Sequence, residues 1–386
     1  MKTLFACVVV ALLTITAIAV ANPDNGRYLV KSDSDALKGV LGVNHVFPAG
    51  FTTDLTQGQL RALDAMGVEV ESVPAWTFAE KPGACTPWPA CKDGGSTPPP
   101  ERSATPADQT PYGMEMLYND ATINSTSGGA GVDVAVLDSG VMKTHLDITR
   151  RVTDCKDFTK GRRISDSCND GNGHGSHVSG TIAADGGADS LGIYGVAPEA
   201  NIMAYKVCGN DGFCWSDDIA VAIRLATDNG AEIISMSLGG SAESSLTRDA
   251  IQYAVDNGVL VVAAAGNSGP ADGSIEWPGA NANVVAVGAV NASEVVPSWS
   301  SRGINNGDGV IETREVEVGA PGVAVESIWN DGAYKTISGT SMATPHVAGL
   351  AAKHWQGSGA ATRAWLQSRA LLHDLHTAGD DTATGL

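Results

Sequence analysis

The hydrophobic pattern of the chain changes character near residue 109. Before it, alternating apolar and polar positions in RYLVK, helical spacing in LTQGQLRALDAMG and a strand-like VEVESV predict a small α+β unit. After it, helix-like segments such as DDIAVAIRLATDNG alternate with continuous apolar runs, namely VDVAVLD, ANIMAYKV, EIISMSL, VLVVAAAG and NVVAVGAV. This alternation predicts an α/β domain whose mainly parallel sheet is flanked by helices on both faces.

A segment rich in proline, glycine and serine separates the two units. The sequence KPGACTPWPACKDGGSTPPPERSATPADQTP is typical of an extended linker. We therefore expect the small unit at residues 22–77, the linker at 78–108 and the α/β domain at 109–386.

The first residues, MKTLFACVVVALLTITAIAVANPD, combine one lysine with a long apolar run. Ala19 and Ala21 form an A-x-A arrangement, which predicts a secretory signal peptide at residues 1–21, removed after Ala21. The alternative is a transmembrane anchor, but the segment that follows is polar. The chain is then expected outside the cell, with no membrane partner after signal removal.

The composition is that of a folded, acidic protein. The 386 residues include 43% hydrophobic side chains and carry a formal net charge of -19. A surface of this sign does not attract nucleic acid or anionic membranes, so neither is expected as a partner. The acidity is compatible with adaptation to high salt or with an ordinary soluble surface.

The cysteine count adds a constraint. Cys7 lies in the signal, which leaves six cysteines and no CxxC motif that would favour zinc or redox chemistry. Export favours disulfides. Proximity in the sequence suggests three pairs, although six cysteines allow other connectivities: Cys85–Cys91, Cys155–Cys168 and Cys208–Cys214.

The stretch SGTSMATPHVAG carries the first candidate for chemistry. It places Ser341 at the mouth of a helix, where unpaired backbone N–H groups and the helix dipole stabilise negative charge. Pro345 is expected in the first turn of that helix. The ordinary alternative is an N-cap serine, so partners elsewhere have to decide.

Three further residues fall where such partners would lie. Asp138 ends the run VDVAVLD, Asn267 follows VLVVAAAG, and His174 enters a helix in DGNGHGSHVSGTIAA. Taken alone, Asp138 and Asn267 are also common residue types in turns. The pair His174 and His177 would suit a zinc site, but no HExxH motif is present. Working groups gather at the carboxyl ends of parallel strands, so together the four residues indicate acyl transfer.

In the order GVDVAVLDSGV, GNGHGSHVSGTIAA, SMSLGG, AAAGN and SGTSMATPHVAG, these segments resemble the subtilisin-type (subtilase) serine proteases over roughly residues 109 to 386. The order Asp, His, Ser is that of the family, and no GxSxG elbow surrounds the serine. Small residues replace the usual ones at three positions without removing a proton-transfer group: Ser139, Ser176 and Ser179.

The resemblance implies the role of each candidate. Ser341 would be the nucleophile, His174 the general base and then acid, and Asp138 the group that orients the imidazole. Asn267 and the Ser341 N–H would form the oxyanion hole. The implied activity is that of a secreted serine endopeptidase acting on proteins or peptides, with no cofactor required for the chemistry, and we expect a monomer.

The family's substrates lie as an extended strand against segments matching KVCGNDGF and SMSLGG. The resemblance implies a first specificity pocket with Glu276 at its base, and a carboxylate there would favour lysine or arginine before the scissile bond. The alternative is that Glu276 turns to solvent and leaves a broad pocket. The expected walls are Ser237, Leu238 and Gly239 on one side, with Ala265 and Gly266 on the other.

The resemblance also suggests a structural calcium ion. Asp108, Asp147 and Asp189 align with the family's strong calcium site, where hard oxygen ligands suit the ion. The loop at 185–190 is longer than in the simplest members of the family.

The small N-terminal unit resembles the family's ferredoxin-like propeptide, which would act as an intramolecular inhibitor in a self-processing zymogen. Its first helix is expected to be short, between Lys31 and Val43. Three alternatives stay open: a retained accessory domain, a catalytically silent peptide-binding protein, and a lipase or esterase.

Overall fold

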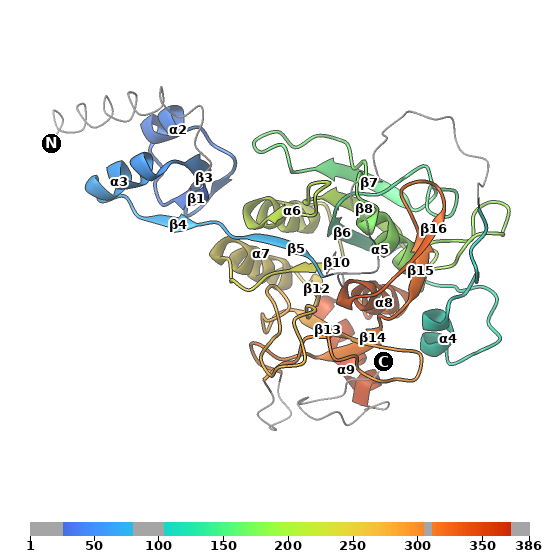
Figure 1. Ribbon diagram of the computed structural model, residues 1–386. Helices are drawn as coiled ribbons and strands as arrows, with labels where there is room; N and C mark the ends of the chain where they lie inside the picture. Colours follow the sequence, from blue (N-terminus) through green and yellow to red (C-terminus); the bar gives the residue numbers. More distant parts are fainter. Residues whose placement is uncertain (1–25, 80–103, 305–310, 372–386) are drawn as a thin grey trace.

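The computed structural model describes residues 26–79, 104–304 and 311–371. A small N-terminal unit lies against one side of a larger α/β domain, and a single strand runs from the first into the second (Figure 1). The predicted signal peptide and most of the linker, with the expected Cys85–Cys91 pair, lie outside the described residues. No helix in the described ranges is long and apolar enough to cross a membrane.

The N-terminal unit is a four-stranded antiparallel sheet covered by two helices. Its strands are β1 (Gly26–Val30), β2 (Val46–Phe47), β3 (Gly50–Leu55) and β4 (Val70–Ser72), in the order β2-β3-β1-β4. Helix α3 (Gln57–Ala65) begins with a capping box between Thr56 and Gln59. Helix α2 (Asp35–Leu41) has only seven residues, as expected. The predicted ferredoxin-like α+β unit is therefore present.

The larger domain is built on seven parallel strands in the order β14-β13-β12-β10-β6-β8-β7. Continuous apolar runs form its centre, because both faces of a parallel sheet are buried. The strands are β6 (Asp133–Asp138), β7 (Val152–Asp157), β8 (Asn201–Lys206), β10 (Ile233–Met236), β12 (Leu260–Ala264), β13 (Val285–Val290) and β14 (Val318–Pro321).

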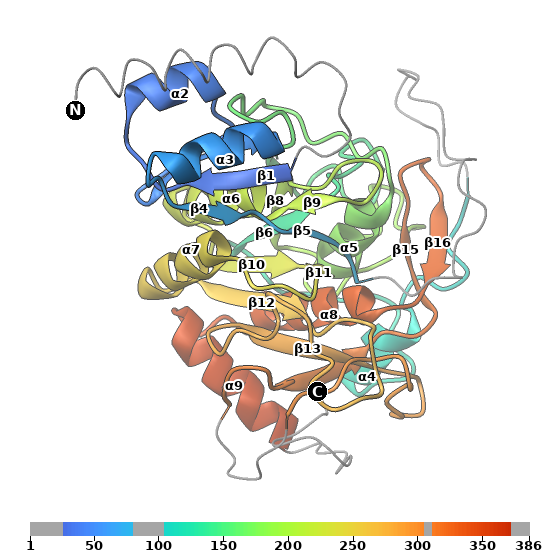
Figure 2. The same cartoon turned by 60° about the vertical axis from the view of Figure 1, so that its left-hand side comes forward.

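Helices cover both faces of this sheet, as the pattern predicted. Figure 2 shows α6 (Ser216–Asp228) and α7 (Ser245–Asp256) beneath the N-terminal unit. Helices α5 (His174–Ala183), α8 (Thr340–Lys353) and α9 (Gly359–Leu371) pack on the other face. Successive residues of a strand divide between the two cores: Val134 and Val136 face one, Ala135 and Leu137 the other.

Shorter elements complete the domain. Helix α4 (Tyr112–Tyr118) precedes the sheet, and β15 (Val325–Ile328) pairs with β16 (Tyr334–Ile337) in an antiparallel hairpin. A second small sheet has the order β11-β5-β9. In it β5 (Ala75–Phe78) leaves the N-terminal unit and lies between β9 (Cys214–Trp215) and β11 (Leu238–Gly239) of the larger domain.

The N-terminal unit shares a core with the domain it covers. Leu29, Phe47 and Val73 belong to the same buried cluster as the inner residues of α6 and α7. Residues of its own core, such as Phe51 and Leu63, form a separate cluster. The unit therefore has one apolar core of its own and a second apolar face that it buries against the larger domain.

Two of the three expected disulfides are formed. Cys155 pairs with Cys168 and Cys208 with Cys214, with Cα–Cα distances of 5.0 and 4.1 Å. Proximity in the sequence was thus a correct guide for the four cysteines that the structure describes.

Candidate active site

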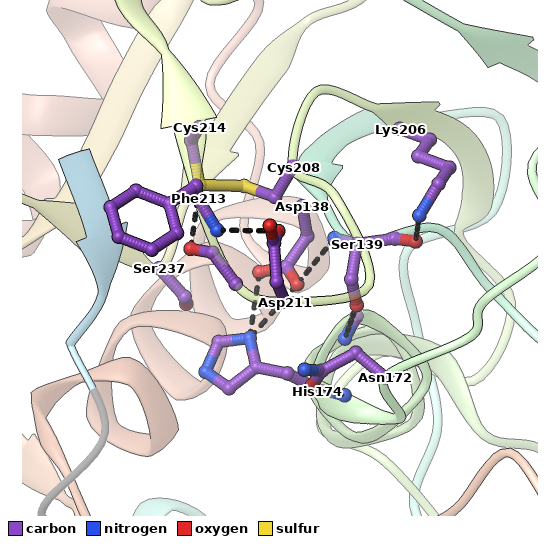
Figure 3. The surroundings of a disulfide bond; sticks show 12 residues. Asp138, Ser139, Asn172, His174, Lys206, Cys208, Asp211, Phe213, Cys214 and Ser237 are labelled. Atoms are coloured by element: carbon purple, nitrogen blue, oxygen red, sulfur yellow. Dashed lines mark hydrogen bonds and ion pairs between the residues drawn. A yellow bond between two sulfur atoms is a disulfide. The ribbon is translucent and has the colours of Figure 1, made fainter. Parts of the chain in front are cut away.

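Asp138 and His174 meet at the carboxyl edge of the sheet. Asp138 is the last residue of β6, and His174 is the first residue of α5. The imidazole Nδ1 lies 2.8 and 3.0 Å from the two carboxylate oxygens of Asp138. Figure 3 shows the imidazole facing this carboxylate, and both side chains are buried. Because a carboxylate only accepts, Nδ1 is the protonated nitrogen and Nε2 faces the other way.

A glycine makes this helix entrance possible. Gly173 precedes α5 with φ 109°, a conformation that side chains other than hydrogen rarely adopt. A Cβ there would lie 2.3 Å from the Trp329 ring. The turn can therefore bring His174 directly to Asp138.

Ser341 is the second residue of α8, where the helix leaves N–H groups unpaired. Its N–H donates to the carbonyl of Ala79 (3.1 Å), and its hydroxyl donates to the carbonyl of Ser237 (2.9 Å). Pro345 is the sixth helical residue, so the expectation that it lies in the first turn was wrong. The Ser341 carbonyl, which a proline four residues later cannot bond, accepts the Ser237 hydroxyl instead (2.9 Å).

The amide of Asn267 is held in one orientation. Its Oδ1 accepts from the N–H of Thr340 (3.0 Å) and from the Thr340 hydroxyl (3.1 Å). An N–H can only donate, so the acceptor is the oxygen and the NH2 group is turned away. That Nδ2 is a buried donor that makes no hydrogen bond within the described residues in this state.

Residues 75–79 form an extended segment between two strands of the larger domain. Ala75 and Trp76 pair with β9, and Thr77 and Phe78 pair with β11. The N–H of Ala79 donates to Ser237 (3.3 Å), so the strand pairing continues to Ser341. The Phe78 ring stacks on the imidazole of His174, with centroids 4.1 Å apart. The segment is thus held in an extended conformation from β9 to Ser341.

Glu276 lies between residues expected in the two pocket walls. Glu276 packs against Gly239 and Gly266: a Cβ on Gly266 would lie 2.6 Å from its carboxyl carbon. Its Oε1 accepts from the hydroxyl of Ser268 (2.6 Å). Glu276 therefore turns inward, between the two expected walls. The other predicted wall residues, Ser237, Leu238 and Ala265, are buried.

The three aspartates expected to hold calcium are not brought together. Asp147 accepts from the N–H of Ile193 (2.9 Å), and the amide of Gln109 reaches the carbonyls of Ser190 and Gly192. Asp108 instead accepts from Thr110 (3.0 Å). Gln109 therefore lies where Asp108 was expected, facing the loop that follows Asp189.

Lys206 is a neighbour of the site that the sequence did not indicate. It ends β8 with its ammonium buried, donating to the carbonyl of Ser139 (2.6 Å) and to Oδ1 of Asn210 (3.1 Å) (Figure 3). Burial lowers its pKa, although the carboxylates of Asp170, Asp157 and Asp138 act in the opposite direction. A strand-end lysine carries no motif, so only the packing reveals it.

Comparison with known proteins agrees with this geometry. Residues 129–385 match the model of the subtilase family, peptidase S8. The chain is 46% identical over 362 residues to "Subtilisin" of Bacillus sp. (strain TA39), which covers 87% of this chain and 82% of the relative. It is 39% identical over 248 residues to "Subtilisin DY" of Bacillus licheniformis, an alignment that covers 64% of this chain and 84% of the relative.

A solved structure titled "S41 Psychrophilic Protease" superposes with a TM-score of 0.69 at 50% identity, covering 72% of this chain and 97% of that one. "Sphericase" gives the same TM-score at 49% identity, with the same coverage of both chains. The chain belongs to the subtilase family and is a subtilisin-type serine endopeptidase.

Proposed function

We propose that the chain is a secreted zymogen that cleaves its own bond between Ala79 and Glu80 through an Asp-His-Ser triad. One observation carries this proposal: the carbonyl of Ala79 accepts a hydrogen bond from the N–H of Ser341 (3.1 Å) at the end of a paired strand. A peptide bond held in this way presents its carbonyl carbon to the Ser341 hydroxyl.

In the first step, the Ser341 oxygen attacks the carbonyl carbon of Ala79 while Nε2 of His174 takes the hydroxyl proton. In the described state that hydroxyl donates to Ser237, so it must first turn to His174. Asp138, bonded to Nδ1, stabilises the imidazolium that forms. The new oxyanion is stabilised by the Ser341 N–H and by Nδ2 of Asn267.

In the second step, the C–N bond breaks and His174 gives its proton to the amine of Glu80. This leaves the carbonyl of Ala79 esterified to Ser341. Water then attacks the ester, with His174 accepting its proton and returning one to the Ser341 oxygen. In subtilisin itself, removing the oxyanion-hole asparagine lowers turnover about 10²–10³-fold, and removing the serine or histidine about 10⁶-fold.

The released N-terminal unit would remain as an inhibitor. It buries Leu29, Phe47 and Val73 against α6 and α7, and Trp76 is only 2% exposed. The indole N–H of Trp76 also donates to the carbonyl of Ala242 (3.0 Å). Contacts of this extent outlast the cleavage of one bond, so full activity requires that the unit be degraded or dissociate.

A structural calcium ion is part of the proposal. Nε2 of Gln109 donates to the carbonyls of Ser190 and Gly192, and the Asp147 carboxylate lies beside Gly192. With the Gln109 amide turned to present its oxygen, these groups would supply the oxygen ligands that suit a hard cation. Such an ion would fix the loop at 185–192 and take no part in the chemistry.

The test compares the expressed chain with Ser341→Ala, following intact mass and the release of peptides from casein. The parent is expected to lose its N-terminal part at Ala79 and to digest casein, while the variant stays full length and silent. A matched Ser338→Ala control, three residues away, should behave like the parent.

A serine-reactive phosphonate probe separates the alternatives. A chain that neither cuts itself nor takes the probe would be a peptide-binding protein and would overturn the proposal. Preferential turnover of fatty esters would instead indicate an esterase.

A further inference from the structure

A guanidinium group is bound between the N-terminal unit and the protease domain. Arg27 of β1 places Nη1 3.0 Å from Asp217 and 3.3 Å from Asp218, in the first turn of α6. Both carboxylates are buried, with side-chain exposures of 0% and 2%. The guanidinium carbon also lies 4.6 Å from the ring centroid of Trp215. Two acids and an aromatic face are the partners that arginine prefers over lysine.

The remaining partners of these acids also come from the N-terminal unit. His45 places Nε2 2.7 Å from Asp218, and the Thr52 hydroxyl donates to Asp217 (2.7 Å). Asp54 of the unit lies 3.6 Å from Nε of Arg27. His45, Asp217 and Asp218 are the one set of three possible metal ligands within 4.8 Å in the described ranges, and Arg27 already bonds both of its acids.

Charge complementarity at this contact is strong. Burial alone lowers the pKa of Arg27, yet the neighbouring carboxylates of Asp217 and Asp218 raise it overall. Burial raises the pKa of Asp218, which the hydrogen bond from His45 opposes. When the N-terminal unit leaves, two carboxylates and the Trp215 face lose every partner named above.

The site lies beside the substrate path. The N–H of Ser216 donates to the carbonyl of Pro74 (3.1 Å), and the N–H of Val73 donates to the carbonyl of Arg27 (2.9 Å). Counting Ala79 as the first residue before the cleaved bond, Pro74 and Val73 are the sixth and seventh. An arginine at either position of an extended substrate could therefore reach the acids that Arg27 occupies.

We propose that Trp215, Asp217 and Asp218 form an arginine-binding subsite, offered by the processed protease to a substrate arginine six or seven residues before the scissile bond. Arg27 occupies it in the zymogen. This inference rests on the proposed loss of the N-terminal unit. It gives the protease a preference for substrates that carry a guanidinium well outside the first specificity pocket.

The experiment uses the processed enzyme obtained from the full chain and peptides with the core Trp-Thr-Phe-Ala before the cleaved bond. One arginine is moved through positions five to nine and compared with citrulline, which has the same shape without the charge. We expect arginine to raise kcat/KM by about three- to tenfold at positions six or seven, mainly through KM, and less so in high salt. Lysine is expected to gain less.

Variants locate the effect. Asp217→Asn and Asp218→Asn should each lower the ratio of kcat/KM for the arginine peptide to kcat/KM for the citrulline peptide, measured on the same variant. Asp228→Asn, an exposed change at the far end of α6, is the matched control and should keep it. The comparison of arginine with citrulline on the parent enzyme needs no variant, so a misfolded variant does not block the test.

The outcomes separate the two proposals. If the core peptide is cleaved but arginine and citrulline are equivalent, the subsite is refuted and the proposed function stands. An equal gain at every position would indicate general attraction to an acidic protein and would also refute it. If no peptide is cleaved, the proposed function itself fails.

Discussion

The disulfide between Cys208 and Cys214 links the Asp138–His174 pair to β9, the strand that pairs with β5. The N–H of Cys208 donates to the carbonyl of Asp138 (3.1 Å), and Cys214 pairs with Trp76 in the small sheet. Figure 3 shows the bond beside the Asp138–His174 pair. Replacing both cysteines with alanine should therefore loosen the position of β9. The other disulfide, Cys155–Cys168, closes the loop after β7 and provides a matched control.

The two disulfides differ in the chain length that they close. The sequence separation is 6 residues for Cys208–Cys214 and 13 residues for Cys155–Cys168. Loop-closure entropy then assigns about 2 kcal/mol of stability to Cys208–Cys214 and about 3 kcal/mol to Cys155–Cys168. For a domain of this size, these values correspond to falls in Tm of roughly 5 and 8 °C. The control should thus be the less stable of the two double variants.

The effect on activity should be reversed: the variant that loses less stability should lose more activity. We expect the Cys208→Ala/Cys214→Ala variant to show a KM raised about three- to tenfold for a peptide that fills the Trp76 position, because β9 is no longer tied to β8. A short peptide that ends before this position should be cleaved as by the parent. The Cys155→Ala/Cys168→Ala variant should leave both KM values unchanged. Equal effects of the two variants on the long peptide would refute the reasoning.

Three further predictions concern the pocket, the ion and acid stability. Glu276→Gly should shift preference from arginine toward phenylalanine before the scissile bond; a parent that already prefers phenylalanine strongly would contradict a basic pocket. A calcium chelator should lower Tm in the parent and in Asp108→Asn, but not in Asp147→Asn. Burial lowers the pKa of His346 to about 4, so below about pH 6.5 the imidazole takes up a proton in the unfolded chain but stays neutral in the folded protein. The free energy of unfolding therefore falls between about pH 6.5 and 4; urea unfolding of Ser341→Ala should show this fall, and adding His346→Leu should reduce it.

The sequence determined the architecture of the larger domain. Runs such as VDVAVLD and VLVVAAAG became β6 and β12 because strands buried on both faces need continuous apolar residues. The same pattern placed Asp138 and Asn267 where these runs end, and glycine-rich turns placed His174 and Ser341 at helix entrances. Local signals suffice there, since period, turn chemistry and strand polarity fix a side chain's position along its element.

The polar strand β7, the strand β14 and the hairpin of β15 and β16 escaped the pattern. β7, VTDCKD, lies at a sheet edge and lacks an apolar run, so it carried too little signal. The wrong prediction for Pro345 has a different cause. A proline is tolerated in the second turn because the Ser341 carbonyl accepts a hydroxyl from Ser237, more than 100 residues away in the sequence.

Only the tertiary structure decided how distant segments combine. It placed Glu276 between Gly239 and Gly266, brought Gln109 rather than Asp108 to the loop near Asp147, and brought the carbonyl of Ala79 to the N–H of Ser341. It also seated Arg27 between Asp217 and Asp218, some 190 residues later in the chain. Such contacts depend on the packing of whole elements against one another, which period and propensity along a single segment do not encode.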